Sequence, residues 1–98
     1  MSRIELAPEI TKDFERIVQH LLDHDARHGE SRVGQIIEAI DVLQRNPLIG
    51  RPAYADLREL VIGRGATGYV ALYRYVAEVD TVFVLSIRGQ HEAGYKRE

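Results

Sequence analysis

The run of residues 68–76 is the sequence feature that most limits how this chain can fold. It reads Gly-Tyr-Val-Ala-Leu-Tyr-Arg-Tyr-Val, and its β-branched and aromatic residues suit the pleated surface of a sheet. A second run of this kind, residues 81–88, follows after the short polar link 77–80. The two runs predict antiparallel strands joined as a hairpin, which the residues upstream must cover.

Two helices are predicted upstream of this hairpin, over residues 8–28 and 31–45. In each, apolar residues recur at intervals of three and four, which is typical of one helix face. The residues expected to pack on the sheet are Phe14, Ile17, Leu21, Ile36, Ile37 and Ile40. Gly29 is expected to end the first helix in a left-handed conformation, and Pro47 to stop the second.

The remaining segments complete the predicted order of elements. Residues 3–6 and 57–62 read as further strands, 48–56 as a loop and 63–68 as a glycine-rich turn. The fold class is therefore α+β in the order β-α-α-β-β-β, with a helical hairpin packed on one face of a small, mainly antiparallel sheet. A chain of 98 residues has room for one core, so residues 1–98 are expected to form a single domain.

Composition excludes several classes of protein. Without cysteine, the chain can form neither disulfides nor thiolate zinc sites. A net charge of -2 and a pI near 6.1 argue against nucleic-acid binding through bulk positive charge. No apolar run approaches the roughly 20 residues of a membrane span, and the N-terminus lacks a secretion signal. We expect a cytoplasmic protein that begins near Met1 and makes no contact with a membrane.

Four segments, taken with this order of elements, resemble the RelE/ParE superfamily of toxins from type II toxin-antitoxin systems. They are the loop at residues 46–52 (Asn-Pro-Leu-Ile-Gly-Arg-Pro), the strand entry at 57–60 (Leu-Arg-Glu-Leu), the strand at 70–74 (Val-Ala-Leu-Tyr-Arg) and the closing run at 87–92 (Ile-Arg-Gly-Gln-His-Glu). The resemblance implies the toxin fold, a cognate antitoxin as partner and no cofactor. RelE-like members cut messenger RNA on the ribosome, whereas ParE-like members block DNA gyrase, often in plasmid stabilisation systems.

One position separates these two branches. Cleavage of RNA through the 2′-hydroxyl needs a cation to stabilise the charge that grows on the phosphate. The resembling nucleases place an arginine three residues before the tyrosine of the central strand. Here that tyrosine is Tyr73, so the position holds Val70. Together with the acidic net charge, this favours the ParE-like branch, a gyrase inhibitor that carries out no chemistry.

Two alternatives stay open at this point. In the first, the protein is a ribosome-dependent endoribonuclease whose catalytic residues are Arg88, His91 and Tyr95 at the end of the last strand; the competing interpretation is that these terminal residues are simply solvated. In the second, the protein is a non-toxic member that binds its antitoxin and autoregulates its operon, reaching operator DNA only through that antitoxin.

Other residue groups have a structural explanation beside the functional one. His20, His24 and His28 are spaced by four, as in some metal sites, but a solvated helix edge is the favoured account, and no metal site is predicted. Tyr69, Tyr73 and Tyr75 share one face of their strand, where core packing is favoured over a platform for stacked bases.

A binding surface is predicted on the sheet face that points away from the helices. On the last strand, alternation places Phe83, Leu85 and Ile87 beneath the helices. The residues predicted to contact the antitoxin or the target are Arg74, Val82, Val84, Ser86 and Arg88. An apolar groove beside the helical hairpin is the alternative place for the antitoxin.

Overall fold

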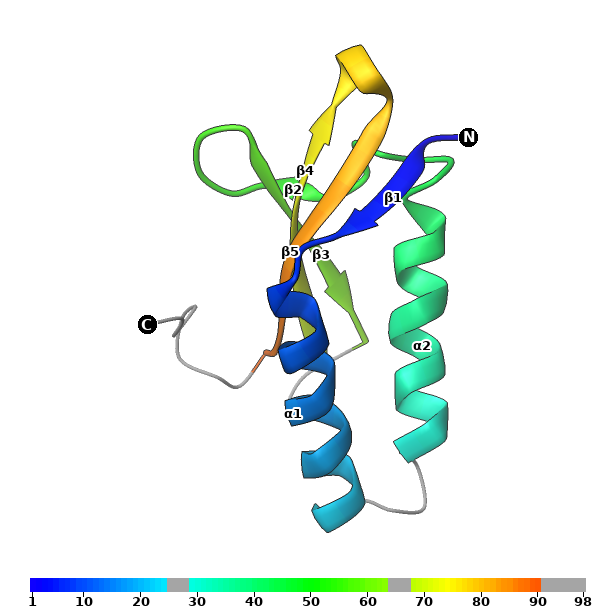
Figure 1. Cartoon of the computed structure of the whole chain (residues 1–98), viewed down its shortest axis with the longest axis vertical. Helices are drawn as coiled ribbons and strands as arrows, with labels where there is room; N and C mark the ends of the chain where they lie inside the picture. The colour runs from blue at the N-terminus through cyan, green and yellow to red at the C-terminus, as the bar shows by residue number, and fades with distance from the viewer. Residues whose placement is uncertain (25–28, 64–67, 91–98) are drawn as a thin grey trace.

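Two helices pack on one face of a five-stranded sheet in the computed structural model, which describes residues 1–24, 29–63 and 68–90 (Figure 1). The elements are β1 (Arg3–Leu6), α1 (Glu9–His24), α2 (Gly29–Val42), β2 (Arg51–Pro52), β3 (Leu57–Ile62), β4 (Tyr69–Val76), the 3-10 helix η2 (Ala77–Val79) and β5 (Thr81–Gly89). The strands lie in the order β1-β5-β4-β3-β2, and β1 with β5 is the parallel pair. The predicted α+β architecture is confirmed.

The predicted boundaries differ from the structure in two places. Gly29 begins α2 rather than ending the first helix, and α2 gives way at residue 43 to tight turns in which Gln44 N–H donates to the Asp41 carbonyl. The predicted loop at 48–56 contains the short strand β2, which pairs with β3 through Arg51 and Glu59. This pairing was not predicted because two residues carry too little pattern to be recognised.

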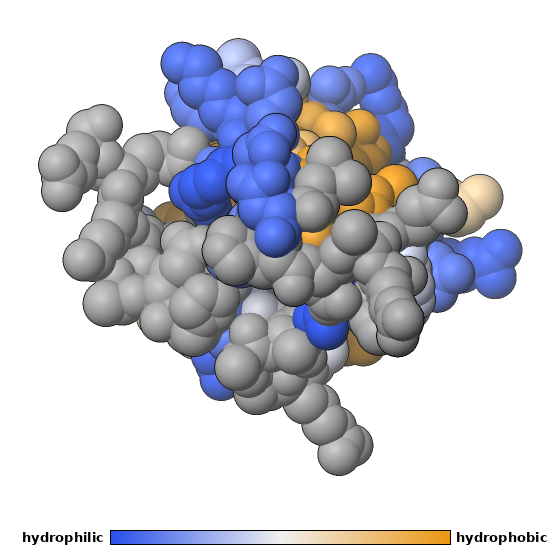
Figure 2. Space-filling view, turned by 90° about the horizontal axis from the view of Figure 1, so that it is seen from below, coloured by the Kyte–Doolittle hydropathy of each residue, from blue (hydrophilic) through white to orange (hydrophobic). Residues whose placement is uncertain are grey.

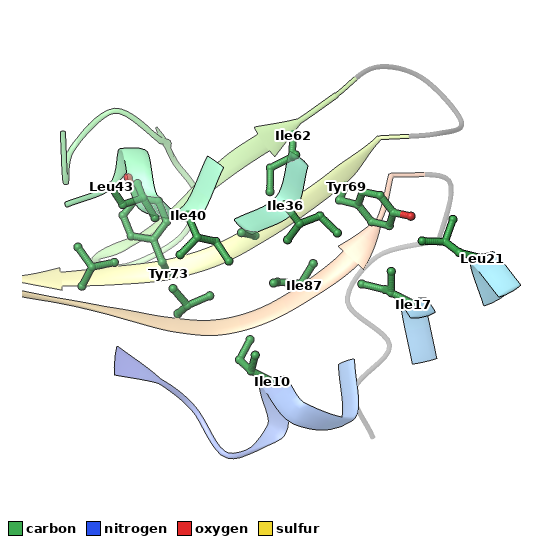
Figure 3. Close-up of a cluster of buried hydrophobic side chains, with 13 residues drawn as sticks. Ile10, Ile17, Leu21, Ile36, Ile40, Leu43, Ile62, Tyr69, Tyr73 and Ile87 are labelled. Carbon is green, nitrogen blue, oxygen red and sulfur yellow. The ribbon is translucent and has the colours of Figure 1, made fainter. Parts of the chain in front are cut away.

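The core lies between the helices and the sheet. Figure 3 shows Ile36 and Ile40 of α2 beside Tyr69 and Tyr73 of β4, and Ile10 and Ile17 of α1 beside β5. Its buried members are Ile10, Ile17, Leu21, Ile36, Ile40, Leu43, Ile62, Tyr69, Ala71, Tyr73, Val82, Val84 and Ile87. Phe14 is partly buried against this cluster. Ile37 is 50% exposed, so its prediction as a core residue is wrong: it follows Ile36 by about 100° around the helix axis and points away from the sheet.

A β-bulge changes which side chains of β5 face the helices. Leu72 lies opposite Ser86, and the next residue, Tyr73, lies opposite Val84, so Leu85 is an extra residue in β5. As a result Val82 and Val84 are fully buried in the core, and their predicted place on the outer face is wrong.

The other assignments on β5 follow from the same bulge. Phe83 and Leu85 are not part of the core cluster, so the prediction that they lie beneath the helices is also wrong. Beyond the bulge the alternation is as predicted, with Ile87 buried in the core. Ser86 and Arg88 pair with Leu72 and Val70, away from the helices.

The turn between β4 and β5 is tied to the N-terminal strand by one carboxylate. Asp80 adopts a left-handed φ of 45°, a conformation that aspartate tolerates better than most residues. Its Oδ1 accepts hydrogen bonds from Ser2 Oγ at 2.6 Å and Tyr75 Oη at 2.7 Å. These two bonds hold the pKa of Asp80 below its ordinary value, and the bond to the carboxylate raises the pKa of Tyr75.

Helix α1 completes the edge of β5 where β1 ends. Strand β1 pairs with β5 as far as Val84. Farther along, Ile87 N–H donates to Asp13 Oδ2 at 3.0 Å, and Arg16 Nη2 donates to the Ile87 carbonyl at 3.1 Å. Two side chains of α1 thus satisfy backbone groups that a neighbouring strand would otherwise pair. This contact fixes the end of β5 that carries Ser86 and Arg88.

The helix surfaces are mixed in character. Figure 2, which views the molecule from the lower end of Figure 1, shows hydrophilic residues bordering apolar ones. Within the described ranges, neither helix is long and apolar enough to cross a membrane.

Candidate functional site

The outer face of the sheet, defined here by Val70, Leu72, Arg74, Ser86 and Arg88, points away from the helices. The register places Val70 opposite Arg88 and Leu72 opposite Ser86. Val70 is 3% exposed and Leu72 is 7% exposed. The middle of this face is therefore apolar but offers little accessible apolar surface to a partner.

Arginines on and beside the outer face are paired with carboxylates of the same chain. Arg74 Nε lies 3.2 Å from Asp56 Oδ2, and Arg51 Nε lies 3.1 Å from Glu59 Oε1. Glu59 stands opposite Leu72 in the sheet. Surface pairs of this kind add little stability. They do offset positive charge that binding to a phosphate backbone would require.

Ser86 and Arg88 lie side by side on this face, as predicted. Ser86 is buried, and Arg88 Nη1 donates to the Gly89 carbonyl at 3.3 Å. The predicted catalytic partners of Arg88, His91 and Tyr95, lie outside the described residues. Arg88 lies opposite Val70, which precedes Arg74 by four residues on β4. At about 3.3 Å per residue, Arg74 and Arg88 are therefore roughly 13 Å apart along the strand direction.

An apolar groove runs along α1, on the helix surface beside the end of β1. Its volume is about 630 Å³, and it is lined by Leu6, Ile10, Thr11, Phe14, Glu15, Val18 and Gln19. Phe14 and Val18 are partly buried, and Leu6 is exposed. Of these lining residues, Phe14 was predicted to pack on the sheet. Leu6 was missed because only the folded chain brings β1 beside the helix.

A second, smaller groove separates α2 from β3. It holds about 370 Å³ and is lined by Gln35, Glu38, Ala39, Val42, Val61, Ile62 and Gly63. Val42 and Val61 are among the exposed large apolar residues. Both grooves lie beside the helical hairpin, which is where sequence analysis placed the alternative antitoxin site.

The loop before β2 is held by a buried tyrosine. Gly50 N–H donates to Tyr73 Oη at 2.8 Å, and Arg58 Nη1 donates to the Gly50 carbonyl at 2.7 Å and to the Leu48 carbonyl at 3.2 Å. Burial raises the pKa of Tyr73 above its ordinary value. A side chain at Gly50 would lie within 2.8 Å of the Glu59 carbonyl, so this position must be glycine.

The histidine row is only partly visible. His20 is exposed, and His28 lies outside the described residues. Across residues 1–24, 29–63 and 68–90, no three side chains of His, Asp or Glu come close enough together to hold a metal ion.

A protein-family model and a curated relative both match most of this chain. The model of the family described as "ParE toxin of type II toxin-antitoxin system, parDE" matches residues 4–94. A curated relative, Toxin RelE3 of Caulobacter vibrioides, is 28% identical over 88 residues, which cover 90% of this chain and 94% of the relative.

Solved structures of low sequence identity share the fold. A chain of the chromosomal ParDE system from P. aeruginosa superposes with a TM-score of 0.75 at 22% identity, covering 91% of this chain and 96% of that one. A chain of the E. coli RelBE toxin-antitoxin complex gives a TM-score of 0.67 at 17% identity, covering 95% of this chain and all of that one.

Proposed function

The chain belongs to the ParE toxin family of type II toxin-antitoxin systems, and we propose that this toxin acts by binding and inhibiting DNA gyrase, with no chemistry of its own. It works in the cytoplasm as a single domain over residues 1–98, and a cognate antitoxin neutralises it. The alternative activity in this superfamily is ribosome-dependent cleavage of messenger RNA.

Val70 is the observation that carries the choice between these activities. It lies opposite Arg88 in the sheet and is buried, so an aliphatic side chain occupies the place where the resembling nucleases keep an arginine. An aliphatic group cannot stabilise the charge of a phosphate transition state. The nearest described arginine along β4, Arg74, is paired with Asp56. The outer face therefore lacks, among the described residues, a second cation directed at a phosphate beside Arg88.

The antitoxin is assigned chiefly to the groove on α1. Related toxins have been solved in toxin-antitoxin complexes. The groove on α1 offers apolar side chains along a helix, whereas Val70 and Leu72 on the outer face are nearly inaccessible. An apolar segment of the antitoxin fits this groove as a helix packs into a groove. Acidic residues flanking that segment then reach Arg74, Ser86 or Arg88 at the rim of the outer face.

Primer extension on messenger RNA from cells expressing the toxin tests the absence of cleavage. Removing a group that stabilises transition-state charge typically costs about two to three orders of magnitude in rate, so intact messages are expected, together with an induced DNA damage response. Arg88→Ala should leave this RNA pattern unchanged. Cuts at defined positions in translated codons that disappear in Arg88→Ala would place the protein among the nucleases instead.

A further inference from the structure

Two neighbouring apolar side chains project from the loop between α2 and β2. Leu48 is 57% exposed and Ile49 is 56% exposed. Neither takes part in the core cluster, and neither lines the grooves described above. Because they are adjacent, the two side chains form one contiguous apolar patch, and such a patch can mark an interaction surface.

The backbone beneath these two side chains is fixed from both sides. Ile49 N–H donates to the Asn46 carbonyl at 3.1 Å, which closes a turn that includes both residues of the pair. Arg58 binds the carbonyls on either side of Ile49, and Tyr73 Oη binds Gly50 N–H. Since the loop is already ordered, binding a partner costs little of the loop's own conformational entropy. Apolar side chains held in place in this way are suited to the buried core of a protein interface.

The charge around the pair differs in sign from that of the whole chain. Residues 43–59 contain three arginines, Arg45, Arg51 and Arg58, and two acids, Asp56 and Glu59, whereas the chain as a whole has a net charge of -2. Glu59 is paired with Arg51, and the arginines of this segment still outnumber its acids. Asp56 is itself paired with Arg74 of β4. A partner that presents an apolar pocket with an acidic rim matches this surface.

This loop and the groove on α1 lie at opposite edges of the sheet. The order β1-β5-β4-β3-β2 puts β1, which contributes Leu6 to the groove, at one edge and β2, which follows the loop, at the other. Four strand spacings of about 4.8 Å separate the edges by roughly 19 Å. A single antitoxin helix seated in the groove, about 10 Å wide, therefore leaves the loop accessible.

We propose that Leu48 and Ile49, with the arginines beside them, form the surface through which the toxin docks on its target enzyme, separate from the surface that holds the antitoxin. The occupant is an acidic, apolar-pocketed surface of a folded protein. This inference rests on the proposed function, because it assumes a protein target rather than RNA.

The test uses a purified double variant that carries both Leu48→Asp and Ile49→Asp. Its matched control is the variant Val79→Asp. Val79 is 57% exposed on the turn between β4 and β5, so it has the same exposure in another part of the fold. Binding to purified DNA gyrase and to the cognate antitoxin is measured for each protein. The double variant should bind gyrase about tenfold or more weakly, as expected for the loss of interface anchors, while antitoxin affinity stays within about twofold of wild type.

Each other outcome counts against the inference. Equal gyrase binding by the double variant and wild type would overturn this inference and leave the proposed function standing. An equal loss of antitoxin affinity would do the same, because the surface would then belong to the antitoxin. A wild-type protein that does not bind gyrase would overturn the proposed function and this inference together. The acidic rim has its own check: Arg45→Glu should slow association with gyrase, and added salt should shrink the difference.

Discussion

Replacing Tyr73 by alanine is expected to lower the free energy of unfolding by about 3–5 kcal/mol, the usual cost of removing a buried aromatic side chain. Tyr73 is fully buried among residues of both helices and the sheet, and Figure 3 shows its ring next to Leu43 and Ile40. Its hydroxyl also accepts the bond that holds the loop at Gly50. The alanine variant therefore loses both core volume and the anchor of that loop.

Urea unfolding of two further variants separates these contributions. Tyr73→Phe keeps the ring but leaves Gly50 N–H without its acceptor, and an unsatisfied buried donor costs about 1–3 kcal/mol. Tyr54→Phe is the matched control, because it removes the same hydroxyl from a tyrosine that is 64% exposed on the surface. Its expected effect is within about 0.5 kcal/mol. If Tyr73→Phe unfolds at the same urea concentration as wild type, the hydroxyl does not hold the loop.

Ile36→Ala should destabilise the domain by about 2–5 kcal/mol, since Ile36 is fully buried and alanine leaves a cavity under α2. The neighbouring residue supplies a control of identical chemistry. Ile37 is half exposed on the same helix, so Ile37→Ala should cost no more than about 1 kcal/mol. Melting temperatures of the two variants measure the difference directly.

A reversed order of these two melting temperatures would show that α2 is rotated about its axis relative to this structure. Equal losses would show that both side chains are buried in solution, for instance between two copies of the protein. Repeating the measurement at several protein concentrations distinguishes that case, because association makes the melting temperature depend on concentration.

The helices and the central strand could be predicted because the spacing of their apolar residues differs between a helix and a strand. Ile17, Leu21 and Ile36 recur at helical spacing, and Tyr69, Ala71 and Tyr73 alternate as a strand face. Ile37 fits the same helical pattern as Ile36, and periodicity cannot choose between adjacent positions at the border of a stripe about 100° wide. Only the packing of α2 on β3 and β4 decides which of the two is buried.

The β-bulge explains why half of the predicted surface on β5 was wrong. A strict period of two puts Val82 and Val84 on one face with Ser86 and Arg88. Leu85 is inserted between two paired positions, so the faces exchange at that point. Nothing in the local sequence marks this insertion, since Leu85 is an ordinary strand residue. Ser86 and Arg88 were placed on the correct face of the sheet because they lie beyond the bulge, where the alternation holds.

The exposed surfaces depended on contacts between distant segments. The groove on α1 needs Leu6 of β1 beside Phe14 and Val18, and the loop at Leu48 and Ile49 is held by Arg58 and Tyr73 from two other strands. Sequence analysis could indicate that an apolar groove lies beside the helices. It could not locate the groove or identify the loop, because exposure is set by tertiary packing.

DNA supercoiling by purified gyrase tests the central claim most directly. The account predicts that adding the toxin stops supercoiling, that adding the cognate antitoxin restores it, and that the toxin leaves messenger RNA on translating ribosomes intact. Undiminished supercoiling at a large excess of toxin, with messages cut on the ribosome in the same preparation, would contradict it.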